Sequence, residues 1–384
     1  MNMMVPKTAA EEALGFALPH RRMEEWKWTD LRRMIATPYA RHAVAAKSAD
    51  IDRLIASSPL ASVKARRIVI VNGVVDAKRS QMARVESTGL VSASIDDVAV
   101  MARTLEAKGV TLKLDGNVDR PIEIIHIATN ESPRAHAVHH TLEVAPGASA
   151  TMIETFLGEG DYFSVAALDV VLGDGARLDR IKLQCESSKA THVSHVSVAM
   201  GAKAVLRDFT LTVGAAINRQ NGTYTFKGEG TDAKISGAYL LSGRQHADTR
   251  LIVDHAVPNC TSREMFKLVM DDHARGIFQG KVIVRPHAQK TDGKQSSHAL
   301  LLSETAEFDA KPELEIYADD VVCGHGATSG DLNHDHLFYL RSRGIPETEA
   351  RTLLIQAFVI EAIETVENEA IRDALAAYAE GLRR

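Results

Sequence analysis

The middle of the chain contains a loose repeat whose members each open with a glycine and continue into a strand-like run. Four segments carry it, namely PGASATMIE, DGARLDRIK, MGAKAVLRD and EGTDAKISG. Their anchor residues are Gly147, Gly175, Gly201 and Gly230, which are separated by 28, 26 and 29 residues. Repeats of this length form solenoids, because a single unit cannot bury its apolar face and stacked units share one core.

The repeating unit consists of strands, since the residues between the anchors show no helical periodicity. Glycine permits the positive φ angles that the corners of such a coil need. We therefore predict a mainly β protein with a parallel β-helix (solenoid) core and helical N-terminal and C-terminal regions. A β-sandwich with glycine turns is the alternative.

The regions flanking the repeat differ from it in their predicted secondary structure. Residues 1–90 are predicted to form a mixed helical and hairpin region, in which TAAEEALGFAL is helical and RRIVIVNGVVD turns at Asn72-Gly73. Residues 91–330 form the predicted β-helix core, and residues 331–384 a C-terminal helical region. Its first helix is predicted to begin at an Asp331 N-cap and to end before Gly344. The C-terminal helices are amphipathic, so they either pack against the solenoid end, dock a partner, or do both.

Composition excludes several classes of protein. The net charge of −5 over 384 residues argues against nucleic-acid binding. No apolar run approaches the ~20 residues of a membrane helix, and the first residues lack the layout of a signal peptide. The cysteines Cys185, Cys260 and Cys323 are far apart and odd in number, which predicts reduced thiols and a cytoplasmic protein. No GxxxxGK[ST] motif is present, so we expect no nucleotide site in this chain.

Two histidine-rich segments could hold a metal ion. In RQHADTRLIVDH, an extended conformation places His246, Asp248 and Asp254 on one face and His255 on the other. We expect this face to be solvated or part of an interface rather than a metal or acid–base cluster. The HDH segment at 334–336 is predicted to lie on an exposed helix face, because residues i and i+2 of a helix do not face each other.

Trp26 and Trp28 lie two residues apart in EEWKWTDL. On an extended segment they would point the same way, and they would either anchor the N-terminal region or pack in the core. Cys185 and Cys260 have no identifiable base beside them, so we expect both to act as small buried hydrophobic residues.

The segment CGHGATSG, residues 323–330, places a thiol and an imidazole two residues apart. If the strand predicted for LEIYADDVV continues, Cys323 and His325 project to the same side, which Gly324 and Gly326 leave unobstructed. Both are good ligands for iron or zinc, yet a structural zinc site needs four. The pair is therefore inert, half of a site completed by another chain, or a nucleophilic dyad.

The segment DAKPELEIYADDVVCGHGATSG, followed by LFYLRSRGIP, closely resembles the C-terminal signature of the SufB/SufD family. GIFQGKVIVRPHAQKTDGKQSSHALLLS, VDHAVPNCTSREMFK and EEWKWTDLRRM are similar to the same family. The resemblance covers most of the chain and is strongest from about 245 to 365. The chain is similar to the SufD branch, being short for SufB and lacking the cysteine-rich and glutamate-bearing segments associated with SufB.

The resemblance implies a β-helix core and a role in iron–sulfur cluster assembly, in a complex with SufB and the ATPase SufC. SufB would pair through the β-helix end, where His325 of the HGAT motif first, and Cys323 second, would help hold a transient cluster. Gly324 stands where many members have serine. SufC would dock on the C-terminal helices, at Leu337, Phe338, Tyr339, Leu340, Arg341, Arg343 and Ile345.

These features lead to the hypothesis of a non-enzymatic scaffold subunit. One alternative is a β-helix enzyme acting on polysaccharides, although such enzymes are typically secreted. Another is a homodimeric metal-binding protein that acts alone. The sequence leaves open whether the isolated chain homodimerises.

Overall fold

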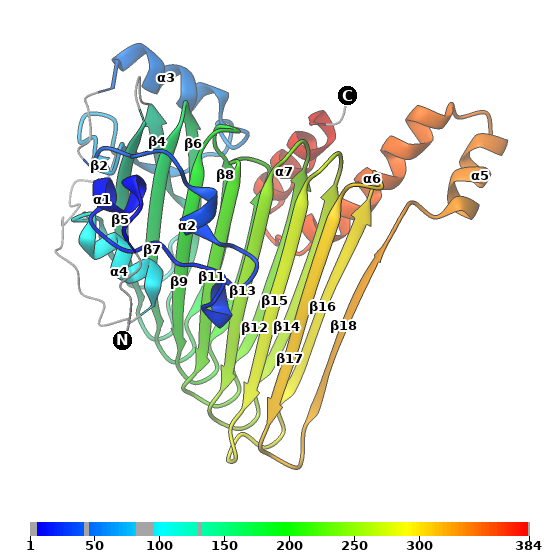
Figure 1. Ribbon diagram of the computed structural model, residues 1–384. Helices are drawn as coiled ribbons and strands as arrows, with labels where there is room; N and C mark the ends of the chain where they lie inside the picture. The colour runs from blue at the N-terminus through cyan, green and yellow to red at the C-terminus, as the bar shows by residue number, and fades with distance from the viewer. Residues whose placement is uncertain (1–5, 42–45, 82–95, 130–132, 383–384) are drawn as a thin grey trace.

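The computed structural model describes residues 6–41, 46–81, 96–129 and 133–382, which form a parallel β-solenoid flanked by helices (Figure 1). A ten-stranded sheet forms one wall and an eight-stranded sheet the other. The strand order is β18-β16-β14-β12-β10-β8-β6-β4-β1-β2 in the first and β17-β15-β13-β11-β9-β7-β5-β3 in the second. From β3 onward, successive strands alternate between the walls, so each coil adds one strand to each sheet.

The strands are divided between the two sheets as follows. The ten-stranded sheet contains β1 (Arg66–Val71), β2 (Val74–Val75), β4 (Ile122–Thr129), β6 (Ser149–Glu159), β8 (Arg177–Cys185), β10 (Val205–Thr212), β12 (Asp232–Leu241), β14 (Thr261–Met270), β16 (Asp292–Leu301) and β18 (Val322–Gly330). The eight-stranded sheet contains β3 (Thr111–Leu114), β5 (Arg134–Val144), β7 (Tyr162–Leu172), β9 (Thr191–Met200), β11 (Ile217–Phe226), β13 (His246–His255), β15 (Arg275–Val284) and β17 (Glu307–Ile316).

Neighbouring coils pair in parallel and in register, as β12, β14 and β16 illustrate. Within the described residues, β1 and β2 form the one antiparallel strand pair. The predicted parallel β-helix is therefore confirmed, and the β-sandwich alternative is wrong. Apolar side chains from both sheets fill the interior as one continuous core.

Positive φ angles mark the corner two residues before a strand of the ten-stranded sheet. Gly147, Gly175 and Gly230 have φ angles of 70°, 67° and 71°, as the repeat predicts. The remaining anchor, Gly201, is wrong as a corner residue, because Lys203 (φ 55°) occupies the equivalent corner before β10. Gly201 is needed for another reason. A Cβ there would lie 2.5 Å from Asp174 Oδ1, which accepts a hydrogen bond from the next backbone N–H.

The N-terminal region contains the predicted hairpin and helix. The β1–β2 hairpin turns at Asn72 (φ 49°) and Gly73 (φ 82°), the two positive φ angles of a type I′ turn. Helix α1 (Ala9–Leu14) begins at a Thr8–Glu11 capping box and ends at Gly15. The remaining N-terminal elements are η1 (Glu24–Trp26), α2 (Leu31–Met34), α3 (Ser48–Ser57) and α4 (Asp97–Thr104). The domain boundary expected near residue 90 lies outside the described residues.

The C-terminal region forms α5 (His334–Ser342), α6 (Glu347–Ile363) and α7 (Glu369–Gly381). Asn333, rather than the predicted Asp331, caps α5, because its side chain accepts hydrogen bonds from two backbone N–H groups of the first turn. Gly344 (φ 87°) follows α5 as expected. Helices α6 and α7 pack on the outer face of the ten-stranded sheet rather than on its end, whereas α5 projects away from both sheets (Figure 1).

Helices cover the outer faces of the early coils. Residues of α1 and α4 pack on β5, β7 and β9, and α3 packs on β1 and β4. Across the described part of the chain, no helix has the length and apolar character needed to span a membrane.

Candidate functional site

Cys323 and His325 lie on β18, the last strand of the ten-stranded sheet. The expected continuous strand is wrong, because β17 ends at Ile316 and residues 317–321 carry the chain into the opposite sheet. The predicted same-side relation holds nevertheless, since both residues belong to β18 at a spacing of two. Their register partners on β16 are Gly293 and Gln295.

The odd-numbered residues at the start of β18 face the solenoid interior. Cys323 packs against the interior apolar core, and a Cβ on Gly293 would lie 3.6 Å from its Sγ. Thr328 is on the opposite face, where its Oγ1 lies 2.7 Å from His298 Nδ1. No coil follows β18 in the described chain, so Cys323 is half-buried and His325 is exposed at the open end.

The environment of Cys323 favours the neutral thiol. Burial is the largest influence and raises the pKa of the thiol, while a backbone hydrogen bond from Gly293 lowers it and the acids Asp292 and Glu264 raise it further. A metal ion binds the thiolate, so binding here must displace a proton.

Two buried polar side chains lie behind the pair. Glu264 on β14 and Gln295 on β16 are register partners, and each residue is 3% exposed. Both carboxyl oxygens of Glu264 and both amide heteroatoms of Gln295 lack a hydrogen-bond partner among the described residues. Burial raises the pKa of Glu264 to about 8. The neighbouring Ser262 Oγ lies 3.0 Å from His255 Nε2, with which it forms a hydrogen bond.

The pair does not complete a metal site in this chain. Within the described ranges, no three or more His, Cys, Asp or Glu side chains are grouped so as to hold a metal ion. Cys323 and His325 therefore supply two donors, where a structural site such as that of zinc uses four.

Both sheets end in full-length strands beside the pair. In the described chain, β17 and β18 each have a neighbouring strand on one side only. Apolar residues of the connection and the last strand are exposed, including Tyr317 at 59% and Val322 at 63%. Free edges of this kind are templates for pairing with another chain.

Comparison with known proteins places the chain in a family. The model of the SUF system FeS cluster assembly SufBD core domain matches residues 126–358. The chain belongs to the SufBD family. It is 32% identical over 380 residues to the iron–sulfur cluster assembly protein SufD of Escherichia coli, covering 94% of this chain and 88% of that protein. A SufBD family protein of Synechocystis is 29% identical over 397 residues, covering 94% of this chain and 86% of the relative.

The matched SufBD core runs from the middle of β4 into α6 and so includes the Cys323–His325 pair. It also includes α5, whose residues differ in exposure. Phe338 and Tyr339 are 74% and 56% exposed, whereas Leu337 is buried. Arg343 lies over the Tyr339 ring at 5.2 Å, and Arg341 pairs with Glu347 at 3.3 Å. Leu340 and Ile345 are half-buried.

The expectation of a solvated or interface face on β13 is wrong for His246 and Asp248. Both are buried beneath the N-terminal segment 24–29, where Thr29 Oγ1 bonds His246 Nε2 at 2.9 Å and also donates to Asp248. Asp254 pairs with Arg285, and His255 stacks on Phe226 inside the solenoid. The 334–336 histidines are exposed, as predicted.

Segment 24–29 also contains the two tryptophans, and its conformation determines their burial. Trp26 is buried in the 3₁₀ helix η1 rather than on an extended segment. Its ring lies 4.6 Å from the Arg219 guanidinium on β11, and its Nε1 donates to Asp97 at 2.8 Å. Trp28 is half-buried. The segment therefore anchors the N-terminal region to the eight-stranded sheet.

The other two cysteines follow the prediction only in part. Cys260 is fully buried in the core, as expected. Cys185 is half-buried as a residue, but its thiol lies next to Tyr378 of α7, and burial raises its pKa to about 12. Neither thiol is positioned as a reactive group.

Sequence reasoning missed the polar groups inside the solenoid. Lys182 is buried with its ammonium 2.7 Å from Ser194 Oγ and 3.1 Å from His192 Nε2, and burial lowers its pKa to about 7. Glu264 and Gln295 were missed for the same reason. A polar residue at an inward position of a repeat is the signal, and reading it requires the register of neighbouring coils.

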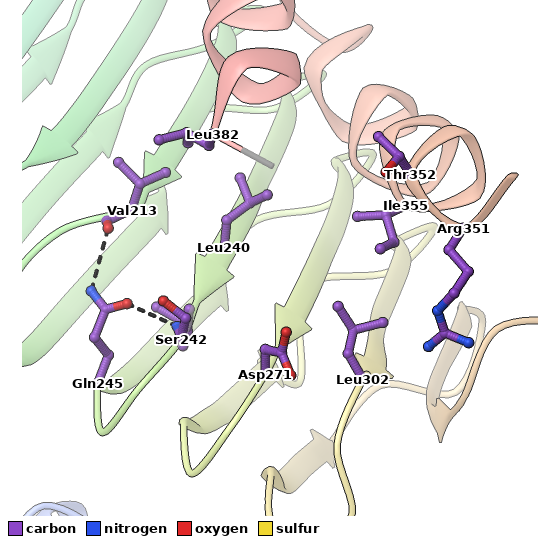
Figure 2. Close-up of a pocket in the computed structure, with 11 residues that line it drawn as sticks. Val213, Leu240, Ser242, Gln245, Asp271, Leu302, Arg351, Thr352, Ile355 and Leu382 are labelled. Atoms are coloured by element: carbon purple, nitrogen blue, oxygen red, sulfur yellow. Dashed lines mark hydrogen bonds between the residues drawn. The ribbon is translucent and has the colours of Figure 1, made fainter. Parts of the chain in front are cut away.

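A cavity of about 480 Å³ lies elsewhere, between α6 and the C-terminal ends of β12, β14 and β16 (Figure 2). Gln245 spans one side by hydrogen bonds to Val213 O and Ser242 N. Of the lining residues, Asp271 and Arg351 are ionisable. This lining supplies one carboxylate rather than the pair that glycoside hydrolysis uses.

Proposed function

We propose that this SufBD family chain is a non-enzymatic scaffold subunit of an iron–sulfur cluster assembly complex. It pairs with a SufB-like subunit through the open end of the solenoid and contributes His325, and secondarily Cys323, to a transient cluster held between the two chains. The observation that carries this proposal is a two-donor pair on the last strand of an open sheet.

Pairing through the solenoid end is supported by the unpaired edges of β17 and β18. Addition of a partner strand there satisfies backbone groups and covers apolar residues such as Tyr317 and Val322. The partner's ligands then complete a coordination set that this chain leaves half filled.

Docking of a SufC-like ATPase on α5 is supported by the exposed aromatic face of that helix. Phe338 and Tyr339 with Arg343 form the mixture of aromatic and arginine side chains typical of interface hot spots. The absence of a phosphate-binding motif from the sequence agrees with energy supplied by a partner. The three free cysteines agree with a reducing, cytoplasmic location.

The test is a matched pair of histidine substitutions in cells that depend on this pathway. His325→Ala removes the ligand, and His298→Ala removes a histidine on the outer face of the neighbouring strand. We expect iron–sulfur enzyme maturation to be lost with the first and retained with the second, with both variants co-purifying with their partners. Normal maturation with His325→Ala would remove this residue from the function.

A homodimer is the competing arrangement, because the same open edges can accept a second copy of the chain. Anaerobic size-exclusion chromatography of the chain alone and with co-expressed partners, with iron and sulfide analysis, separates the two. Iron and sulfide bound by the chain alone, and not increased by partners, would favour the homodimer.

A further inference from the structure

A column of polar side chains runs from the solenoid interior to the open end. Glu264, Gln295 and His325 occupy register-paired positions on β14, β16 and β18. Side chains paired in this way point to the same side of a sheet, about 4.8 Å apart. On the preceding strand β12 the equivalent residue is Ile235, so the column begins at Glu264 and ends at the candidate ligand.

The two inner members of the column are costly to bury. Leaving a buried polar group without a hydrogen bond costs about 1–3 kcal/mol, and neither Glu264 nor Gln295 has a partner within the described residues. Such groups in a native protein require an explanation. One explanation is that these two side chains are available to hydrogen-bond a neighbouring group, and that this bond is absent in the isolated chain.

The opposite sheet is shaped to admit the Gln295 side chain. Gly280 on β15 faces it, and a Cβ at that position would lie 1.6 Å from Gln295 Nε2. Any larger residue at position 280 would exclude the amide from its present place. The chain therefore makes room for an amide at this level of the interior without giving it a partner there.

His325 is the neighbour that the amide can reach. A side-chain amide both donates and accepts, so Gln295 can bridge Glu264 on one side and an imidazole nitrogen on the other, whichever protonation state Glu264 has. Histidines that bind metals ordinarily use their second ring nitrogen in a hydrogen bond to a carbonyl, carboxylate or water, which fixes the tautomer and the ring orientation.

We infer that Gln295 is a positioning residue for His325. In the isolated chain the side-chain amide of Gln295 has no hydrogen-bond partner among the described residues. Once a second chain covers the open end, the amide hydrogen-bonds one ring nitrogen of His325, with Glu264 as its second partner, and the other ring nitrogen is left for the second chain's side. Both the covering of the open end by a second chain and the role in cluster binding rest on the proposed function.

The column also distinguishes the two members of the pair. Cys323 has Gly293 as its register partner, and Gly293 has no side chain to bond the thiol. His325 thus has a polar support inside the sheet that Cys323 lacks. This difference agrees with His325 as the first ligand and Cys323 as the second.

The hydrogen bond is tested by nitrogen NMR of ¹⁵N-labelled histidine rings in the full-length chain bound to its unlabelled SufB-like partner. The His325 signals are assigned by their loss in His325→Ala. We expect neutral His325 to show one dominant tautomer in the parent chain and a mixed population in Gln295→Leu. Ser297→Ala, at an inward position of the same strand, is the matched control and should leave the signals unchanged.

Unchanged His325 ring-nitrogen signals in Gln295→Leu would overturn the inference. Folding is checked by thermal unfolding, where Gln295→Leu should leave the midpoint unchanged or raise it, because it removes an unpartnered buried amide. Glu264→Gln keeps the shape of the side chain and serves as the milder variant. It should change the tautomer ratio in the same direction as Gln295→Leu, and no change in either would contradict the column.

Maturation of iron–sulfur enzymes gives the second readout. Loss of such a supporting residue typically lowers metal affinity or activity about 10- to 100-fold. We expect Gln295→Leu to fall in this range and Gln295→Glu, which keeps an acceptor, to recover part of the loss. If His325→Ala matures enzymes normally while the tautomer still depends on Gln295, the proposed function fails and the positioning role stands. If His325→Ala abolishes maturation while Gln295→Leu changes neither readout, the positioning role fails and the proposed function stands.

Discussion

The two ends of the solenoid differ in the length of their edge strands. At the N-terminal end the ten-stranded sheet finishes in the two-residue β2, and the eight-stranded sheet in the four-residue β3. At the C-terminal end both sheets finish in long strands, β17 with 10 residues and β18 with 9. Short edge strands discourage pairing with other chains, whereas long ones invite it.

The interior of the middle coils differs from the interior near the open end in how charged side chains are paired. Near the middle, the buried Arg180 pairs with Glu154 at 2.6 Å and with Asp208 at 2.8 Å. Near the open end, neither carboxyl oxygen of the buried Glu264 has a hydrogen bond of ordinary geometry among the described residues, although Ser262 and Arg263 lie close enough to lower the pKa that burial raises. The described chain thus pairs its interior charges in the middle coils and leaves a buried carboxyl group without an ion pair near the open end. Buried polar atoms without a hydrogen-bond partner also occur in the early coils, for example His126 Nε2.

The largest expected effect comes from breaking the satisfied network. Arg180→Met leaves Glu154 and Asp208 buried without their cation, and removal of one partner from a buried pair costs about 3–5 kcal/mol. Chemical denaturation should show this loss in the free energy of unfolding. Gln295→Leu at the other end, measured in the same way, should show none, and equal losses would remove the contrast.

The pH dependence of stability gives the next effect. The pKa of Glu264 is raised in the folded state from 4.5 to about 8, so between these values the folded chain binds a proton that the unfolded chain has released. Stability from this group is present below pH 4.5 and is lost as pH rises toward 8, with an upper bound of about 4–5 kcal/mol.

This contribution is isolated by comparing the parent chain with Glu264→Gln from pH 5 to 8. The difference in their free energies of unfolding should shift with pH in favour of the variant. The buried Lys182, with a pKa lowered to about 7, acts in both proteins alike and cancels in the difference. A difference that does not vary with pH would mean that Glu264 is paired in solution.

Charging the open edge should weaken pairing without weakening the fold. Tyr317→Asp combined with Val322→Lys places charges on an exposed apolar surface, and we expect at least a tenfold loss of affinity for the proposed SufB-like partner. Val171→Lys, at an exposed position on β7, is the matched control. Affinities measured by titration of the purified chains decide the matter, and equal losses in both variants would argue against a specific edge.

The smallest expected effect concerns α5. Phe338→Ala should change the free energy of unfolding by less than about 0.5 kcal/mol, because the ring is solvent-exposed. It should weaken binding of the proposed partner, a SufC-like ATPase, by roughly 1–2 kcal/mol. The control is Leu353→Ala, an exposed apolar residue on α6. Retained co-purification of the ATPase with Phe338→Ala would place its docking site elsewhere.

The parts of the fold that short-range rules govern could be predicted from the sequence. Asn72-Gly73 specifies its turn alone, and three of the four anchor glycines mark corners. The corner before β10 could not be assigned from Gly201, since a glycine is equally required where a neighbouring coil approaches closely, as Asp174 approaches Gly201. Burial of His246 by Thr29 also escaped prediction, because the two residues are far apart in the chain.

Of the candidate site, only the two residues on the last strand could be predicted from the sequence. Cys323 and His325 are adjacent in a recognisable segment, whereas Glu264, Gln295 and His325 are 31 and 30 residues apart. These separations exceed the 26–29 residues of the repeat detected in the sequence, because the connections between the last coils are longer. Finding the column therefore required the strand register itself.

The N-terminal segment 24–29 has one more consequence. In a solenoid each coil is held mainly by its neighbours, so the terminal coil, with one neighbour, is the first to fray. Glu24 reaches from this segment to Lys311 on β17 at 2.7 Å, while Trp26 and Thr29 hold the segment to β11 and β13. Residues from the beginning of the chain thus contact its last coil, and they restrain the edge that we propose as the docking surface before any partner binds.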